Sequence, residues 1–134
     1  MSQQTQSNLK LGKDEILRGF EAYKKVFRNS RIAESKYLKL YYQKTEFIES
    51  PHTLVRVGFT VSKKQLKKAV KRNRIKRLLK EAYRLNKSAL LERPGLKPMN
   101  MILTVNEKCG LEELCRNGFS LFNGDILKVF ERIR

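Results

Sequence analysis

The sequence predicts an α+β domain, a two-layer α/β sandwich in which helices pack against one small sheet. Apolar residues recur every three or four positions near residues 14–29 and 70–85, which is the spacing of amphipathic helices. Between and beyond these segments they alternate with polar residues or form short runs, as strands do. The 134 residues suit one domain, and an apolar share of 40% suits one core. We expect a disordered N-terminal arm at 1–12 and a single domain at 13–134.

The first predicted helix lies at residues 14–29, DEILRGFEAYKKVFRN. Its apolar side chains share one side at helical spacing. Asp14 could cap the helix and Asn29 could end it. Gly19 weakens the beginning, so the firm part of the helix would be 20–28.

Two predicted strands follow this helix. The first is rich in tyrosine and lies near 36–44. A turn at 49–52, ESPH, leads to the second strand within 53–62. Alternation in the second strand puts four apolar residues on one side: Val55, Val57, Phe59 and Val61.

The last third of the chain predicts a loop, a strand and an interrupted helical tail. The loop at 92–98 contains two prolines, and the apolar run at 99–106 suits the interior of a sheet. In the tail, Asn-Gly pairs at 117–118 and 123–124 interrupt the helical pattern. We expect a short helix, a break, and a last helix near 125–132.

The formal net charge of +17 indicates an anionic partner, because charge of this size destabilises the compact state through self-repulsion. RNA, DNA and anionic lipid are the candidates. The positive charge is concentrated between Lys63 and Lys80, where ten Lys and Arg residues occur without one acid. A solvated helix face normally mixes the two signs to gain ion pairs one turn apart. This run therefore favours an interaction surface for phosphates.

The same run belongs to a predicted helix within 67–86 that also has an apolar side. Ile75, Leu78, Leu79, Ala82 and Leu85 would face the sheet. Arg74 lies at one edge of the opposite arc, and Tyr83 lies beside the other edge, formed by Arg72 and Lys76. Asn73 could read a base or ribose, hold a metal-bound water, or be a polar spacer. The exposed arc would contain Arg72, Asn73, Lys76, Arg77, Lys80 and Arg84.

Other classes fit the sequence less well. A self-contained nuclease needs clustered carboxylates or a histidine base, yet His52 is the only histidine and lies in a turn. Cys109 and Cys115 are too few to build a zinc site, and we expect them to be buried or half-buried free thiols. A helix-turn-helix DNA binder would not place its basic helix between strands. A membrane-surface helix would need the apolar side that the core already uses.

A family resemblance adds to this interpretation. The segment RVGFTVSKKQLKKAVKRNRIKRLLKEAYR, residues 56–84, resembles the hallmark segment of the bacterial ribonuclease P protein subunit. Its most specific part is Arg-Asn-Arg at 72–74 followed by Ile-Lys-Arg. The segment AYKKVFRNSR, residues 22–31, resembles the first helix of that family. The resemblance covers about 13–134 and is strongest at 55–85.

The resemblance implies a small, mostly antiparallel sheet of about four strands, in αβββαβα order, with a left-handed βαβ crossover. It implies an endoribonuclease holoenzyme that removes the 5′ leader of precursor tRNA. The partners would be ribonuclease P RNA and precursor tRNA, with no membrane and no obligate protein partner. Mg²⁺ and catalysis would reside mainly on the RNA, so no catalytic residue and no tightly bound cofactor are expected on this chain. A cytoplasmic location is expected, since the first ten residues lack the apolar core of a signal peptide and no apolar run is long enough to span a membrane.

The resemblance also implies site residues. The surface for the RNA subunit, close to the metal ions, would contain Arg72, Asn73, Arg74, Lys76, Arg77, Lys80, Arg84, Lys63 and Lys64. A cleft for the leader would contain Tyr23, Phe27, Tyr37, Tyr41, Arg72 and Lys76. The spacing of Tyr23 and Phe27 also fits plain core packing. The alternative function is that of a structural RNA-binding protein of the ribosome or of another ribonucleoprotein.

Overall fold

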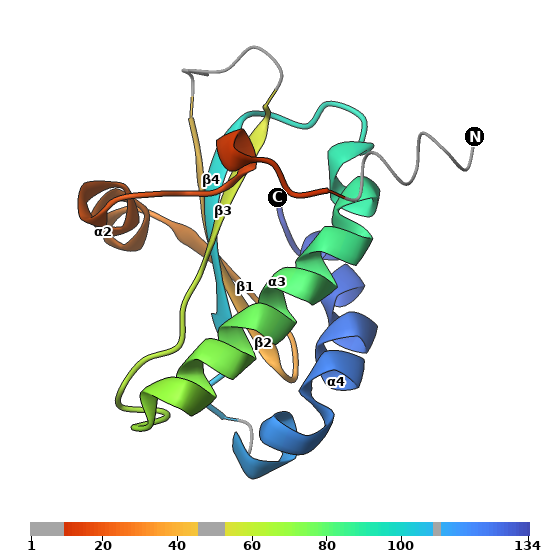
Figure 1. The fold of residues 1–134 in the computed structure, drawn as a ribbon. Coiled ribbons are helices and arrows are strands. Elements are labelled where there is room, and N and C mark those ends of the chain that lie inside the picture. The colour runs from red at the N-terminus through yellow and green to blue at the C-terminus, as the bar shows by residue number, and fades with distance from the viewer. Residues whose placement is uncertain (1–9, 46–52, 109–110) are drawn as a thin grey trace.

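The computed structural model describes residues 10–45, 53–108 and 111–134. These residues form a four-stranded sheet with helices on both faces (Figure 1). Helices α3 and α4 lie together on one face, and the short helix α2 lies on the other. The elements in chain order are η1 (Lys13–Glu15), α2 (Phe20–Arg28), β1 (Arg31–Glu34), β2 (Leu38–Lys44), β3 (Val55–Phe59), α3 (Ala69–Leu91), β4 (Met99–Val105) and α4 (Leu111–Glu131).

The sheet has the order β1-β2-β4-β3. The pairs β1–β2 and β2–β4 are antiparallel, and β3 pairs with β4 in parallel. The predicted α+β class with a small, mostly antiparallel sheet is therefore confirmed. Strands β3 and β4 are joined through α3, as the implied βαβ unit requires, and the hand of this crossover stays a prediction.

The main core fills the space between the sheet and the pair α3–α4. Alternate residues of β2 enter it, so that Leu38, Leu40 and Tyr42 are buried, while Lys39 and Tyr41 lie on the opposite face of the sheet, where Tyr41 contacts α2. A smaller cluster under α2 contains Leu17, Val26 and Ile102. Burial of a large apolar side chain contributes about 1.5–3 kcal/mol, so the larger cluster carries most of the stability.

Strand β1 was implied only by the αβββαβα order of the resemblance. The sequence pattern did not locate it, because its four residues, RIAE, are too few to show alternation. Tertiary contacts hold it in place. The side chain of Ser35 and the backbone N–H of Tyr37 both donate to the carboxylate of Asp125, the latter at 2.9 Å. Asp125 is buried on α4, so this helix fixes the β1–β2 turn.

The apolar side of α3 is rotated from the predicted one. Ile75, Leu79 and Ala82 are fully buried as expected, but Leu85 is 36% exposed. Tyr83, which was expected beside the exposed arc, is 1% exposed. Its ring lies between Phe59 of β3 and Phe130 of α4, with ring centroids at 5.9 and 6.1 Å. Those two aromatic contacts determine which side of α3 faces the sheet.

The C-terminal tail consists of two helices joined at a kink, so the predicted break at 117–118 is confirmed, while the last helix begins earlier than the predicted 125. The backbone leaves helical geometry at Asn117 alone (φ −121°, ψ 19°). The second expected break, at Asn123–Gly124, is absent from α4. Phe122 and Ile126 are fully buried around it, and the Asn86 amide donates to Asn123 at 2.7 Å. Core packing and this hydrogen bond outweigh the low helix propensity of the pair.

Helix α2 covers Phe20–Arg28, the firm part that was predicted, and ends at Asn29. Asp14 does not cap it. Asp14 belongs to η1, and the N-cap of α2 is Gly19 with φ 93°. A positive φ of this size is readily adopted only by glycine.

The segment before α2 is attached to the domain through Lys87 of α3. Its ammonium donates to the carbonyl of Lys10 and to the carboxylate of Glu15 at 2.9 Å, and its side chain is 4% exposed. Leu11 packs against the main core. The last residues of the predicted disordered arm therefore contact the domain, and residues 1–9 of that arm lie outside the described part.

Three further expectations concern residues outside the described ranges: the turn at 49–52 with His52, and the environments of Cys109 and of the Cys115 side chain. Among the helices of the described chain, none combines the length and apolar character needed to cross a bilayer.

We predict that Lys87→Met lowers the free energy of unfolding by about 1.5–3 kcal/mol, because the Glu15 carboxylate loses a charged hydrogen-bond donor in a half-buried position. Urea denaturation checks this. The control is Lys80→Met, which removes an exposed ammonium from the same helix and should change stability by no more than about 0.5 kcal/mol. Equal stability of the two variants would contradict the role of Lys87.

Candidate nucleic-acid interface

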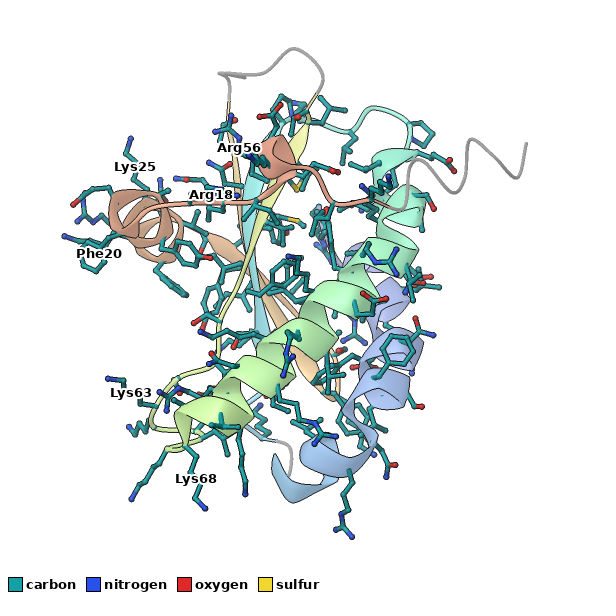
Figure 2. All side chains as sticks on the ribbon, in the orientation of Figure 1. Arg18, Phe20, Lys25, Arg56, Lys63 and Lys68 are labelled. Carbon is teal, nitrogen blue, oxygen red and sulfur yellow. The ribbon has the colours of Figure 1, made fainter. Side chains whose placement is uncertain are left out.

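The acid-free run between Lys63 and Lys80 forms a loop and the first half of α3; we call it the basic segment. Figure 2 shows Lys63 and Lys68 pointing away from the domain into solvent. Lys64, Lys67 and Lys71 are also exposed. A dense set of exposed cations without acids attracts phosphates and makes binding depend on salt.

The loop of the basic segment is held in a defined shape by uncharged hydrogen bonds. The backbone N–H of Gln65 donates to the Ser62 hydroxyl at 3.1 Å. The Gln65 amide donates to the carbonyl of Val105 at 3.3 Å, which fastens the loop to the end of β4. The lysines of the loop are thus presented from a fixed support.

Arg72 completes this support. Its guanidinium donates to the carbonyls of Leu66 and Lys67 at 2.8 and 2.6 Å, and it is half-buried. The predicted RNA-facing role of Arg72 is therefore combined with a structural one. Loss of its side chain would release the loop that carries Lys63 and Lys64.

The remaining predicted residues of α3 divide into three groups. Asn73, Arg77 and Lys80 are exposed, in agreement with the predicted arc, and Arg74 at its edge is exposed as well. Lys76 is half-buried. Arg84 forms an ion pair with Glu81 one turn away. The hydrogen bond that the Arg84 guanidinium donates to the Glu81 carboxylate lowers the pKa of Glu81. The positive surface of α3 is therefore strongest in its first three turns.

A second surface lies on the exposed flank of α2. Phe27 is 47% exposed and contacts Tyr41 of β2 edge-to-face, with ring centroids 4.9 Å apart. Phe20, at 75%, is the most exposed aromatic residue among those described, and the ammonium of Lys24 lies 5.2 Å from its ring. Lys39 lies 5.3 Å from the ring of Tyr41. We call Phe20, Phe27 and Tyr41 the aromatic surface.

Tyr23 joins this flank of α2 but lies deeper. Its ring rests against Gly58 of β3, where an added Cβ would lie 2.3 Å from the hydroxyl oxygen. Burial raises the pKa of Tyr23, and a hydrogen bond with the Phe59 backbone partly opposes that shift. Tyr23 therefore fixes α2 on the sheet and offers less free ring surface than Phe27.

The structure brings together Tyr23, Phe27 and Tyr41 of the predicted leader cleft, but not Tyr37. Tyr37 packs against the main core on the α3–α4 side. The open cleft itself stays a prediction, since three cavities among the described residues are lined by other side chains.

Phe20 and Lys39 were missed as site residues. The seven-residue spacing of Phe20 and Phe27 places both on one side of a helix, and this signal could have identified Phe20.

The donor groups of the basic segment do not suit direct Mg²⁺ ligation. Mg²⁺ prefers carboxylate and phosphate oxygens, and residues 63–80 contain no acid. In the described ranges, no three His, Cys, Asp or Glu side chains gather in a possible metal site. The exposed amide of Asn73 can hydrogen-bond a water molecule or a ribose.

Comparisons with known proteins agree with one another. The family model described as Ribonuclease P matches residues 11–133. The ribonuclease P protein component of Chlorobium phaeobacteroides is 35% identical over 130 residues, covering 92% of this chain and 88% of that protein. The solved RNase P protein from Thermotoga maritima is 25% identical with a TM-score of 0.69, covering 90% of this chain and 98% of its own. The Staphylococcus aureus RNase P protein shares the fold at 18% identity and a TM-score of 0.64, covering 87% and 93%.

We predict that Arg77→Ala weakens binding to a bacterial ribonuclease P RNA by about 1.5–3 kcal/mol, the value of a charge-assisted hydrogen bond. Its thermal melt should match that of the wild type within about 0.5 kcal/mol, because Arg77 is exposed. Filter binding and thermal melts of the same preparations check both statements.

The control for this prediction is Arg116→Ala, which removes an exposed arginine from α4. It should leave RNA affinity within about twofold of the wild type, since screening by salt weakens distant charges. If the two variants bind RNA equally well, Arg77 does not belong to the interface.

Proposed function

The chain belongs to the family of ribonuclease P protein components, and we propose that it holds the 5′ leader of precursor tRNA beside the catalytic RNA. As a component of that ribonuclease, it acts in tRNA processing with ribonuclease P RNA as its partner. The proposal concerns the division of labour between its surfaces: the basic segment binds the RNA subunit, and the aromatic surface binds the leader.

The observation that carries the proposal is the combination of exposed aromatic rings with cations. Phe20, Phe27 and Tyr41 expose ring faces or edges, and Lys24 and Lys39 lie over two of these rings. Unpaired bases stack on aromatic side chains with about 1–3 kcal/mol per base. The exposed ammonium of Lys24 suits a phosphate between the bases, whereas the ammonium of Lys39 is paired with the Glu107 carboxylate at 3.4 Å. Stacking tolerates any base, which an enzyme acting on many different leaders requires.

The basic segment supports the other half of the proposal. In Figure 2, Phe20 and Lys63 both project toward the left of the view, and Lys68 projects from the lower end of α3 nearby. One continuous RNA assembly could therefore contact both the aromatic surface and the basic segment. Exposed Arg74 and Arg77 provide planar guanidinium groups that hold two phosphate oxygens each, and the lysines provide mobile charges.

Catalysis is assigned to the RNA subunit in this proposal. Mg²⁺ supplies charge stabilisation to the phosphoryl transfer and would be held mainly by RNA phosphates. The part of this chain near the ion would be Asn73, which can hydrogen-bond an ion-bound water, flanked by arginines that balance phosphate charge. No catalytic residue of this chain and no obligate protein partner is involved. We place this activity in the cytoplasm, where a bacterial cell makes its precursor tRNA.

A structural RNA-binding protein of the ribosome was the alternative. It would share the charge and the basic helix, but it would have no use for exposed rings paired with cations on α2. The family assignment does not support it.

We predict that Phe27→Ala reduces the preference of the holoenzyme for precursor tRNA over mature tRNA by about 5- to 150-fold. This corresponds to the loss of one stacked base, worth about 1–3 kcal/mol. The measurement is the affinity of the assembled holoenzyme for precursor tRNA with a leader of several nucleotides, and for mature tRNA.

The matched control is Leu127→Ala, which truncates a 44% exposed apolar residue on α4. It should keep the wild-type preference, and both variants should bind the RNA subunit as the wild type does. A wild-type holoenzyme with equal affinity for the two tRNAs would refute the leader role altogether.

A further inference from the structure

The flank of α2 opposite the aromatic surface borders a cavity of about 510 Å³. Lys25 and Phe27 are two residues apart on the helix and therefore about 200° apart around it. Phe27 contacts Tyr41 on one flank, while Lys25 lines the cavity on the other. Figure 2 shows Lys25 and Phe20 leaving α2 in different directions. Helix α2 thus separates the cavity from the aromatic surface.

The floor of the cavity is a row of three polar side chains across the sheet. Asn100 of β4 pairs in register with Gln43 of β2 on one side and with Arg56 of β3 on the other. All three line the cavity. The neighbouring row, Tyr41–Ile102–Gly58, is apolar or small and lies under α2. The sheet therefore changes from apolar to polar where the helix stops covering it.

The walls of the cavity are cationic. Lys25 and Arg28 come from the last turns of α2 and Lys44 from the end of β2, and all three are exposed. Not one of the twelve described residues that line the cavity is acidic. Lys25 and Arg28 also offset the negative end of the helix dipole. That explanation does not extend to Lys44 and Arg56, which come from strands.

We propose that this cavity binds one unpaired nucleotide of RNA, with its phosphate on the cationic walls and its base or ribose on the amides of Gln43 and Asn100. Arginine holds phosphate oxygens in a planar fork, and side-chain amides both donate to and accept from base edges and the 2′-hydroxyl. A concave site fits a nucleotide that is turned out of a single strand. An RNA duplex presents a wide and shallow minor groove, and no base of it could enter the cavity.

This inference rests on the proposed function, because it takes RNA as the partner. Two sources offer the same chemistry: an unpaired loop of the RNA subunit, or leader nucleotides beyond those on the aromatic surface. The arms of the experiment separate them.

The main test is the double variant Arg28→Ala/Lys44→Ala, measured as the protein alone for binding to the RNA subunit and as the assembled holoenzyme for binding to precursor tRNA. Its control is Arg116→Ala/Lys128→Ala, which removes the same charge from exposed positions on α4. Affinity is measured over a range of salt for the RNA subunit, for precursor tRNA with a long leader and for precursor tRNA with a short leader. For either the RNA subunit or the long-leader precursor tRNA, the cavity variant should bind about 25-fold more weakly near 0.1 M salt. The dependence of its log affinity on log salt should be shallower by about 1.4, because single strands contribute about 0.7 per neutralised charge.

A variant at an uncharged residue tests the row of polar side chains at the floor of the cavity. Asn100→Ala should weaken the same affinity by about 2- to 13-fold without changing the salt slope, since it removes hydrogen bonds of about 0.5–1.5 kcal/mol but no charge. Thermal melts of every variant check the fold. If Asn100→Ala does not fold, Gln43→Ala replaces it.

Weakening for the RNA subunit assigns the nucleotide to that RNA, and weakening for the long leader alone assigns it to the leader. The inference is overturned if the cavity variant matches the α4 control in every arm, or if Asn100→Ala and Gln43→Ala both bind as the wild type does. A wild-type chain that binds neither RNA would instead refute the proposed function.

Discussion

The position of α2 depends on the absence of a side chain at Gly58. Any Cβ there would lie 2.3 Å from the Tyr23 hydroxyl, so only glycine lets the Tyr23 ring rest on the sheet. With Tyr23 in place, Val26 is fully buried against Ile102 and the helix cannot roll. The rest of that face follows from helix geometry, because it places Phe27 on one flank and Lys25 on the other. One close contact in the core thus orients two chemically different surfaces.

A net charge of +17 opposes folding, and two acids of the domain fasten separate segments together. Glu15 joins the N-terminal segment to Lys87, and Asp125 holds the β1–β2 turn. The basic segment, by contrast, contains no acid and is ordered by carbonyl and amide contacts through Arg72 and Gln65. An anionic partner relieves this repulsion, so we expect RNA binding to stabilise the domain.

Hydrophobic periodicity predicted the elements that are long enough to show a repeat, such as α2 at Phe20–Arg28 and the apolar positions Ile75 and Leu79 of α3. It failed where contacts between distant residues determine the structure. Contacts with Phe59 and Phe130 turn the Tyr83 side of α3 into the core. The buried Asp125 stabilises the strand β1 of four residues. In the candidate site, too, some residues could be predicted from the sequence and others only from the tertiary structure. Spacing and resemblance indicated Tyr23 and Phe27, but the row Gln43–Asn100–Arg56 exists only once the strand order β2-β4-β3 is known.

The most direct test of the protein as a ribonuclease P component is reconstitution with a bacterial ribonuclease P RNA at a magnesium concentration where that RNA alone cleaves slowly. The measured quantity is the rate of 5′-leader release from precursor tRNA, with the RNA alone, with the protein alone, and with both. Cleavage should be fast only with both, since we propose that the protein organises binding and that the RNA performs the chemistry. A rate with both that equals the rate with RNA alone, or leader release by the protein alone, would contradict this division of labour.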